Sequence, residues 1–243
     1  MRLSAPIYRL KREAKMLARS EGIALHRALD RIAEREGFSA WSLLAARAAD
    51  AAPAKTLYPR LVPADMVLLG ARPGHGKTLM SLELMVAAMR AGHRGVFFTL
   101  EYSAADMLAA FQAIGEDPNT FGSRFEFDNS DAISAHYMIG RLDRAARGTL
   151  VVVDYLQLLD QKRTHPGVME QIRSLKTFAL RRGVIFIFVS QIDRSYAATQ
   201  RTVPALEDVR LPNPLDLSLF SKSCFLHDGE VHVAAMNESL RGR

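Results

Sequence analysis

A glycine-rich stretch, GARPGHGKTLMSLEL (70–84), has the residue types that bind a nucleoside triphosphate. It follows the apolar run MVLL (66–69), expected to be a buried strand, and it precedes an expected helix that starts near Lys77. Gly74 and Gly76 allow backbone amides to curl around a phosphate, and the N-terminus of the helix favours negative charge. The order of strand, loop and helix therefore predicts a phosphate-binding loop.

The side chains at the end of this loop have separate expected roles. Lys77 is expected to neutralise the β- and γ-phosphates of ATP, and Thr78 is expected to ligate Mg²⁺ through its hydroxyl. The usual pattern begins with glycine, and here alanine takes that place. The residues expected to hold the nucleotide are Ala71, Arg72, Pro73, Gly74, His75, Gly76, Lys77 and Thr78.

Three further polar residues end later apolar runs. Asp154 ends TLVVVD, where a carboxylate can hold the water shell of the magnesium ion opposite Thr78. Glu101 ends GVFFTLE, where it either orients the attacking water as a general base or caps the following helix. Gln191 ends VIFIFVSQ, where it either contacts the γ-phosphate or caps its strand. The residues alone leave both pairs of alternatives open.

Short apolar runs alternate with helical patterns over residues 65–243. Continuous β-rich runs separated by helices predict an α/β fold with a mostly parallel sheet covered on both faces. The expected strands are 66–69, 95–100, 149–154, 184–190, 221–226 and 231–236, and the expected helices are 77–90, 104–114, 132–147 and 167–182.

The first quarter of the chain has a different character. Residues 1–50 show three short amphipathic patterns, the third with Ser39 as a possible N-cap, which predict a small helical module around Trp41. Residues 51–64 contain three prolines and no sustained period, and we expect them to be a linker. The remaining range, 65–243, is expected to be a single α/β domain.

The positive charge is concentrated in the first quarter. Residues 1–60 hold 12 Lys or Arg and 6 Asp or Glu, whereas residues 61–243 hold 20 of each. This basic excess favours nucleic acid as the partner of the N-terminal module. Helices with a solvated basic face, and a collar that joins subunits, are alternatives that the pattern leaves open.

Composition excludes several classes of protein. No apolar run approaches the roughly 18 residues of a membrane span, and the N-terminus is too charged for a signal peptide. The single cysteine, Cys224, lies in the apolar run SLFSKSCFL, so neither disulfides nor a thiolate metal site is expected. We expect a soluble, cytoplasmic protein with no membrane association.

The motifs together resemble the C-terminal ATPase domain of the DnaB-type replicative DNA helicases. The order ARPGHGKT, FFTLEYSAADM, LVVVDYLQLL, IFVSQIDRS and EDVRLPNP is similar to that family over about residues 61–243. The specific pieces are Arg72-Pro73 inside the loop, the DYLQL string (154–158) and the SQ-x-x-R-S string (190–195).

This resemblance implies a RecA-like core that assembles as a ring, usually of six subunits, with ATP between neighbours and single-stranded DNA in the channel. It implies Lys77, Thr78, Asp154 and Gln191 in the nucleotide roles given above, and it implies Glu101 as the catalytic base. A replication or loading partner is also implied. The basic residues in its DNA-contacting loops, and hence the expected DNA-binding residues, are Lys162, Arg163, Arg194 and Arg201.

The sequence departs from the DnaB-type pattern at both ends. The first sixty residues do not resemble the family's large helical N-terminal domain and linker helix. At the other end, Asn237 and Glu238 stand where the family has cations that reach a neighbour's γ-phosphate. Either Arg241 or Arg243 is then expected to reach the γ-phosphate bound by a neighbouring subunit, or the chain lacks such a trans-acting cation.

Three functions are consistent with these residues. The leading expectation is an ATP- and Mg²⁺-dependent DNA helicase or translocase that acts on single-stranded DNA. A RecA-like ATPase that switches or assembles without unwinding is the second. The third is a DNA-binding adaptor that acts through the basic N-terminal helices.

Overall fold

The structure, a computed structural model, describes residues 3–5, 7–50, 53–160, 165–193, 196, 203–211, 214–227 and 230–236. The chain divides into two compact units, Met1–Lys55 and Thr56–Arg243. The first is the helical unit and the second is the α/β unit that contains the glycine-rich loop. No helix in the described ranges is both long and apolar enough to cross a membrane.

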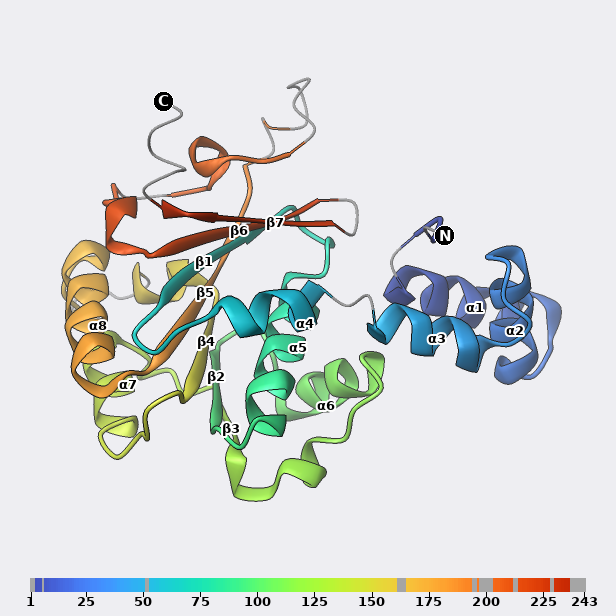
Figure 1. The fold of residues 1–243 in the computed structure, drawn as a ribbon, viewed down its shortest axis with the longest axis horizontal. Helices are drawn as coiled ribbons and strands as arrows, with labels where there is room; N and C mark the ends of the chain where they lie inside the picture. The colour runs from blue at the N-terminus through green and yellow to red at the C-terminus, as the bar shows by residue number, and fades with distance from the viewer. Residues whose placement is uncertain are drawn as a thin grey trace. The chain divides into compact units, whose positions relative to one another are not determined.

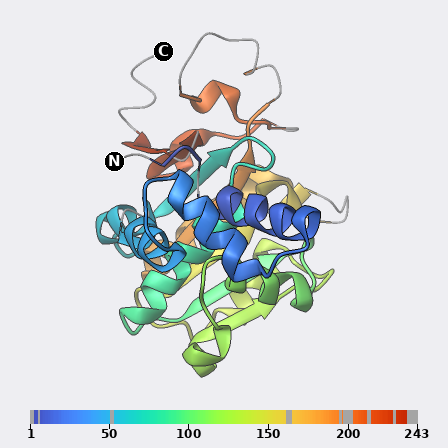
Figure 2. The same ribbon diagram turned by 90° about the vertical axis from the view of Figure 1, so that its right-hand side faces the viewer.

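The helical unit consists of α1 (Ile7–Glu21), α2 (Leu25–Arg35) and α3 (Trp41–Asp50), coloured blue in Figure 2. Its core is centred on Leu10, Ile32 and Leu44, and Trp41 packs against it while remaining partly exposed. The expected N-cap at Ser39 is wrong. Helix α3 begins at Trp41, so Ala40 is its N-cap residue, and the amide of Trp41 donates to Oδ1 of Asp30 at 2.9 Å.

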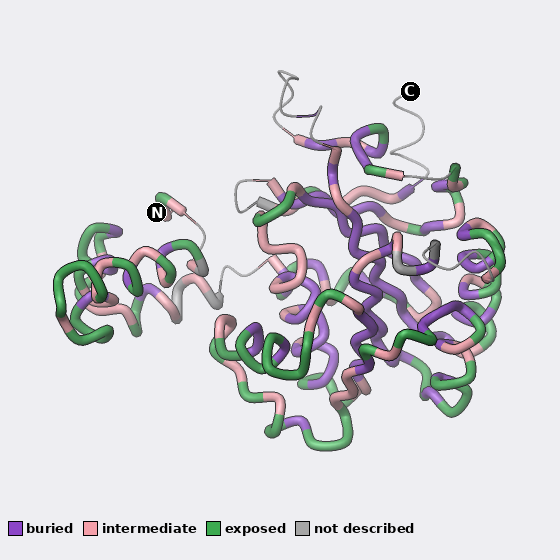
Figure 3. Tube along the Cα trace, turned by 180° about the vertical axis from the view of Figure 1, so that it is seen from behind, coloured by how far each residue is buried: buried purple, intermediate pink, exposed green. Residues whose placement is uncertain are grey.

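The α/β unit is built on a seven-stranded sheet with the order β3-β2-β4-β5-β1-β6-β7 (Figure 1). All neighbouring strands are parallel except β6 and β7, which pair antiparallel. The central strands are almost fully buried (Figure 3), as expected for a parallel sheet with both faces covered. The strands are β1 (Met66–Ala71), β2 (Gly95–Thr99), β3 (Phe125–Asp128), β4 (Leu150–Asp154), β5 (Ile185–Gln191), β6 (Lys222–His227) and β7 (Glu230–Ala235).

Helices cover both faces of this sheet. Figure 1 shows α7 and α8 packed together on one face, with α5 and α6 on the other. The expected α/β class is therefore confirmed. The helix expected at 132–147 is shorter, since the chain leaves helical geometry after Arg141 and buries Leu142 and Ala145 in a turn. The α-helices are α5 (Lys77–Arg90), α6 (Ala104–Ala113), α7 (Ala135–Arg141) and α8 (Val168–Arg182).

Short helices occupy much of the range 51–64 that the sequence suggests as a linker. Helix α4 (Pro53–Leu57) starts at a proline, which is tolerated in a first helical turn because its missing N–H is not needed there. The 3₁₀ turn η1 (Tyr58–Arg60) follows and packs on α5. The other 3₁₀ turns are η2 (Pro118–Arg124), η3 (Leu156–Asp160), η5 (Leu206–Asp208) and η6 (Leu217–Leu219).

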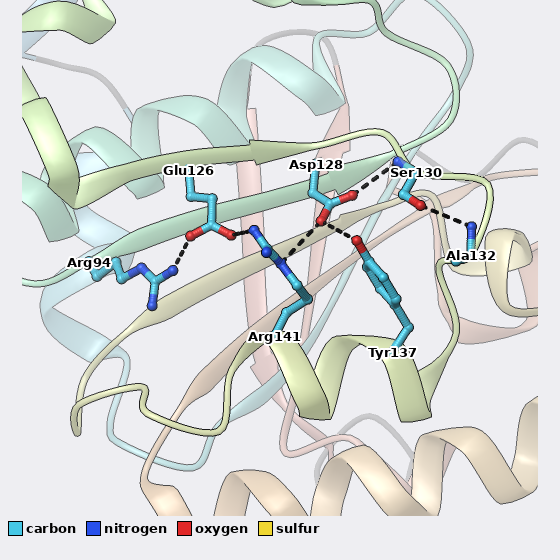
Figure 4. Close-up of polar contacts among 7 residues, drawn as sticks. All are labelled: Arg94, Glu126, Asp128, Ser130, Ala132, Tyr137 and Arg141. Carbon is cyan, nitrogen blue, oxygen red and sulfur yellow. Dashed lines mark hydrogen bonds and ion pairs between the residues drawn. The ribbon is translucent and has the colours of Figure 1, made fainter.

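Strand β3 is an edge strand that the sequence did not reveal. Its Glu126 accepts from the guanidinium groups of Arg94 and Arg141, and its Asp128 accepts from the hydroxyl of Tyr137 at 2.9 Å (Figure 4). These contacts tie β3 to α7 and to the start of β2. A short edge strand with charged side chains is poorly suited to pair with a further strand.

Candidate active site

The candidate site lies where parallel strands end, the usual position of ligands in open α/β sheets. Strand β1 ends at Ala71, and the chain then turns into α5 at Lys77. The amide of His75 donates to the carbonyl of Arg72 at 3.1 Å, which closes the turn. Gly74 and Gly76 have φ angles of 76° and 82°. These left-handed conformations are open to glycine and strained for other residues.

The N-terminus of α5 forms one wall of this loop. Gly76 is its N-cap residue, and no side chain among the described residues caps the helix there. The first amides of the helix are therefore open to an anion, and the helix dipole favours one at this point. The structure thus has an uncapped helix N-terminus, which favours an anion, where the sequence predicts a phosphate-binding loop.

Alanine at the first position of the loop has a simple explanation. Ala71 is the last residue of β1, pairs in register with Gln191 of β5, and is fully buried. Its backbone does not have the positive φ that would require glycine. The departure from the usual pattern therefore leaves the shape of the loop intact. Arg72 and His75 are partly exposed, and Pro73 and Gly74 are exposed, so the loop is accessible to a ligand.

Thr78 and Asp154 form the polar centre of the site. The Thr78 hydroxyl donates to Oδ2 of Asp154 at 2.9 Å, although the two residues are 76 positions apart in the chain. Asp154 ends β4 and is only 2% exposed. The Tyr102 hydroxyl lies 3.3 Å from Oγ1 of Thr78, to which it donates. Three oxygen-bearing side chains therefore meet beside the first turn of α5.

Burial and, to a smaller extent, neighbouring charges shift the pKa values of Asp154 and Lys77. Burial raises the pKa of Asp154 to about 6; the negative charge of Glu101 adds to this, while the Thr78 hydrogen bond and Lys77 oppose it. Burial also lowers the pKa of Lys77, and the carboxylates of Asp154 and Glu101 oppose that shift. Lys77, Glu101 and Asp154 therefore lie close enough to interact. A carboxylate held at an unfavourable desolvation cost is poised to bind a cation.

The donor set fits a magnesium ion held together with a nucleotide. A hydroxyl and a carboxylate oxygen are hard ligands of the kind Mg²⁺ prefers, and Mg²⁺ usually takes one or two protein oxygens plus phosphates and water. No group of three or more His, Cys, Asp or Glu among the described residues could hold a metal ion by itself. Thr78 and Asp154 are therefore the residues that would share such an ion with phosphate oxygens.

Glu101 follows β2 and is exposed. Its amide donates to Oγ1 of the buried Thr99 at 3.0 Å, which fixes the backbone at the strand end. Helix α6 is instead capped by Ser103, whose hydroxyl accepts from the amide of Asp106. The capping role that the sequence left open for Glu101 is therefore taken by Ser103.

Gln191 lies at the end of β5, beside the end of β1. The chain that follows it pairs with a later segment. The amide of Arg210 donates to the carbonyl of Gln191 at 2.8 Å, and the amide of Asp193 donates to the carbonyl of Asp208 at 2.7 Å. Residues 191–193 and 208–210 are therefore hydrogen-bonded to each other. We call these two paired stretches the stems of the segment 194–207 that joins them in the chain.

Several expected residues lie outside the described ranges. The expected DNA-binding and trans-acting residues are all among them: Lys162, Arg163, Arg194, Arg201, Arg241 and Arg243. Within the described ranges, the structure brings Lys77, Thr78, Glu101 and Asp154 together, with Gln191 on a neighbouring strand end.

Two contributions to the site were missed by sequence reasoning. Tyr102 directly follows Glu101, but its hydrogen bond to Thr78 depends on the folded chain. His75 of the loop stacks on His227 at the end of β6, with ring centroids 6.2 Å apart. Since β6 is separated from the loop by more than 140 residues, nothing local in the sequence marks this contact.

Comparisons with known proteins agree with this geometry. The family model described as "ATPase: KaiC" matches residues 55–208, more than half of the chain. A search of curated proteins found no match.

Two solved structures show the same fold. A DnaB-like replicative helicase, solved in a study of its interactions with primase, has a TM-score of 0.53 and 21% identity, and the match covers 68% of this chain and 47% of that one. The second structure is the ATPase domain of another protein, with a TM-score of 0.55 and 22% identity over 72% of this chain and 75% of that one. The chain thus spans about half the length of the DnaB-like helicase. It belongs to the KaiC ATPase family, and its α/β unit is an ATPase domain with the RecA-like fold of the DnaB type.

Proposed function

We propose that the protein is an ATP- and Mg²⁺-dependent motor that acts on single-stranded DNA, and that its motion separates the strands of duplex DNA. The observation that carries the nucleotide part is the 2.9 Å hydrogen bond between Thr78 and Asp154 beside the open N-terminus of α5. The DNA part is supported by the family resemblance of the motifs and by the shared fold with a DnaB-like replicative helicase.

Each residue has a role in this proposal. Lys77 neutralises the β- and γ-phosphates, and Thr78 and Asp154 hold the ion. When bound, Mg²⁺ neutralises the charge that develops on the phosphate oxygens. Glu101, exposed at the end of β2, orients the attacking water and accepts its proton. The electrostatic interaction of Lys77 with Asp154 and Glu101 supports these assignments.

Gln191 is proposed as the sensor of the γ-phosphate. Its backbone is hydrogen-bonded to Arg210, so a small shift at the end of β5 is passed to both stems of the segment 194–207. That segment contains two of the basic residues expected to contact DNA, Arg194 and Arg201. Loss of the γ-phosphate would in this way change the grip on DNA.

Assembly into a ring, usually of six subunits, is part of the proposal. ATP would then lie between neighbours, and a cation from the next subunit, Arg241 or Arg243, would reach the γ-phosphate. If so, adding an Arg241→Ala, Arg243→Ala subunit to wild type should inhibit the mixed assembly more than simple dilution does. Inhibition in strict proportion to the fraction of variant would count against a trans-acting arginine. A replication or loading partner is also proposed, by analogy with the DnaB-like helicase whose interactions with primase were studied.

Strand separation tests the proposal directly. A fork made of two DNA strands, one labelled, is incubated with ATP and Mg²⁺, and release of the labelled strand is measured with wild type and with Glu101→Gln. We expect release by wild type alone. ATP turnover without strand release would instead favour a nucleotide switch, and release equal to that of Glu101→Gln would contradict the helicase proposal.

A further inference from the structure

Helix α1 of the helical unit presents a row of cations to solvent. At 100° per residue, four exposed basic side chains fall within a sector of about 120° around the helix axis. The buried residues of the same helix, Leu10 and Ala14, lie on the opposite side and pack in the core of the unit. We name this row the basic stripe, and its members are Arg9, Arg12, Lys15 and Arg19.

Most acidic side chains of the helical unit bind groups that do not belong to the basic stripe. Glu13 pairs with Arg35 at 3.4 Å, and Glu21 pairs with Arg31. Asp30 accepts from the amide of Trp41 at 2.9 Å. Glu36, which is buried, accepts from the amide of Ser4 at 2.7 Å. Of the acids whose side chains the structure describes here, only Glu34 of α2 makes no hydrogen bond or ion pair through its carboxylate.

The positive charge of the basic stripe is therefore not compensated by ion pairs within the described structure. Within the described part of the chain, none of its four members makes an ion pair with an acidic side chain. Lys11, beside the stripe, has its pKa lowered first by burial and then by the positive charge of Lys15, which indicates repulsion between neighbouring cations. Such an uncompensated row attracts an anion with repeated charges.

The dimensions favour a nucleic-acid backbone. From Arg9 to Arg19 the helix rises about 15 Å, at about 1.5 Å per residue. Duplex DNA carries one negative charge for about every 1.7 Å of its axis, so several phosphates fall within reach of the stripe. A membrane-surface helix would need a free apolar face, but the apolar face of α1 is used in the core of the unit.

We propose that the basic stripe is a nucleic-acid-binding site that contacts backbone phosphates. It belongs to a unit without the glycine-rich loop, and it adds a second nucleic-acid contact to the one proposed for the ATPase domain. Phosphate contacts of this kind position a protein on nucleic acid and carry little sequence information. The proposal is independent of ATP turnover.

The test uses the full chain without nucleotide, so failure of the ATPase proposal does not affect it. Binding to a labelled DNA duplex and to a labelled single strand of the same length is measured by fluorescence anisotropy from about 50 to about 200 mM salt. The test variant is Arg12→Gln with Arg19→Gln. The matched control is Arg31→Gln with Arg35→Gln, which removes the same charge from the same unit but at cations already paired with acids.

We expect the test variant to lower the slope of log affinity against log salt by about 1.8 on duplex or about 1.4 on single strand. The larger loss of affinity identifies which form the stripe prefers, and the control should keep the wild-type slope. Equal slopes for the two variants would overturn the proposal, as would loss of binding to anionic phospholipid vesicles without loss of binding to DNA.

A second variant protects this test against misfolding. Glutamine is nearly as good a helix former as arginine, and the stripe residues are exposed. Trp41 is the only tryptophan of the chain and lies in the helical unit, so its fluorescence reports whether that unit is folded. The single change Lys15→Gln should give a smaller loss of slope of the same kind, and an unchanged slope would contradict the proposal.

Discussion

The two units differ in how far their charged side chains are exposed to solvent. In the ATPase domain, two charged groups beside the glycine-rich loop are shielded from water: Asp154 is 2% exposed, and burial shifts the pKa of both Asp154 and Lys77. In the helical unit, the basic side chains that the structure describes are exposed except for the partly buried Lys11, and most of the described acids are held by partners within the unit.

This difference separates two uses of charge. Desolvated groups interact strongly at short range and suit chemistry on a small, highly charged ligand. Exposed groups interact weakly one by one, and a row of them suits contact with an extended polyanion. Mutations in the two units should therefore differ in size, in salt dependence and in what they change.

The largest effect is expected at Glu101. Changing Glu101→Gln removes the proposed base and leaves the loop intact, so turnover should fall by about 10²- to 10⁴-fold while nucleotide binding persists. Lys77→Ala should instead weaken nucleotide binding itself. The checks are steady-state phosphate release and equilibrium binding of a fluorescent ATP analogue. Full turnover by the Glu101 variant would show that another group serves as the base.

Asp154→Asn should remove activity and at the same time stabilise the protein. The pKa of Asp154 is about 6 in the folded state, above its ordinary value of 3.8, so the folded protein binds more protons between these values. Stability without ligand therefore falls as pH rises from about 4 to about 6, and the cost is fully present above that range. At pH near 8, the variant should gain about 3 kcal/mol in the free energy of unfolding.

Urea unfolding followed by circular dichroism, at pH near 5 and near 8, measures this gain. The gain should be smaller at the lower pH. An exposed acid, Asp143, provides the control, because Asp143→Asn should change stability by less than about 1 kcal/mol at either pH. A destabilised Asp154→Asn protein at the higher pH would mean that ionised Asp154 is well accommodated.

A moderate effect is expected at Tyr102. Tyr102→Phe removes the hydroxyl that donates to Thr78 at 3.3 Å and leaves the ring in place. We expect a severalfold change in the Mg²⁺ concentration that gives half-maximal turnover, because the bond orients a proposed metal ligand. Titration with Mg²⁺ at saturating ATP measures it. An unchanged Mg²⁺ dependence would make the tyrosine a packing residue only.

The smallest effect is expected in the helical unit. Arg35→Gln breaks the pair with Glu13, whose two side chains are 62% and 40% exposed, and should cost no more than about 1 kcal/mol. Unfolding followed by the fluorescence of Trp41 reports this unit selectively. A cost of several kcal/mol would show that the surface pairs hold the unit together and would weaken the contrast between the two regions.

Much of the α/β unit follows from the sequence because its signals are local. A strand, a glycine-rich turn and a helix are adjacent in the chain, and each buried central strand is a continuous apolar run. Strand β3 was missed because FEFD (125–128) is short and has charged residues at alternate positions that bind partners across the sheet edge.

Contacts between distant segments could not be predicted from one sequence. The start of α3 depends on Asp30, which belongs to the preceding helix, and the hydrogen bond of Tyr102 depends on how β2 and α5 come together. The pairing of residues 191–193 with 208–210 likewise depends on the path of the chain between them. In each case the deciding partner is set by tertiary structure.

The central claim is that ATP turnover in the α/β unit responds to single-stranded DNA. Steady-state ATP hydrolysis by the purified chain, with and without single-stranded DNA at low salt, tests it most directly, because phosphate contacts weaken steeply as salt rises. We predict strong stimulation by DNA in wild type and none in Glu101→Gln. Turnover that is the same with and without DNA would contradict the claim and would favour a nucleotide switch.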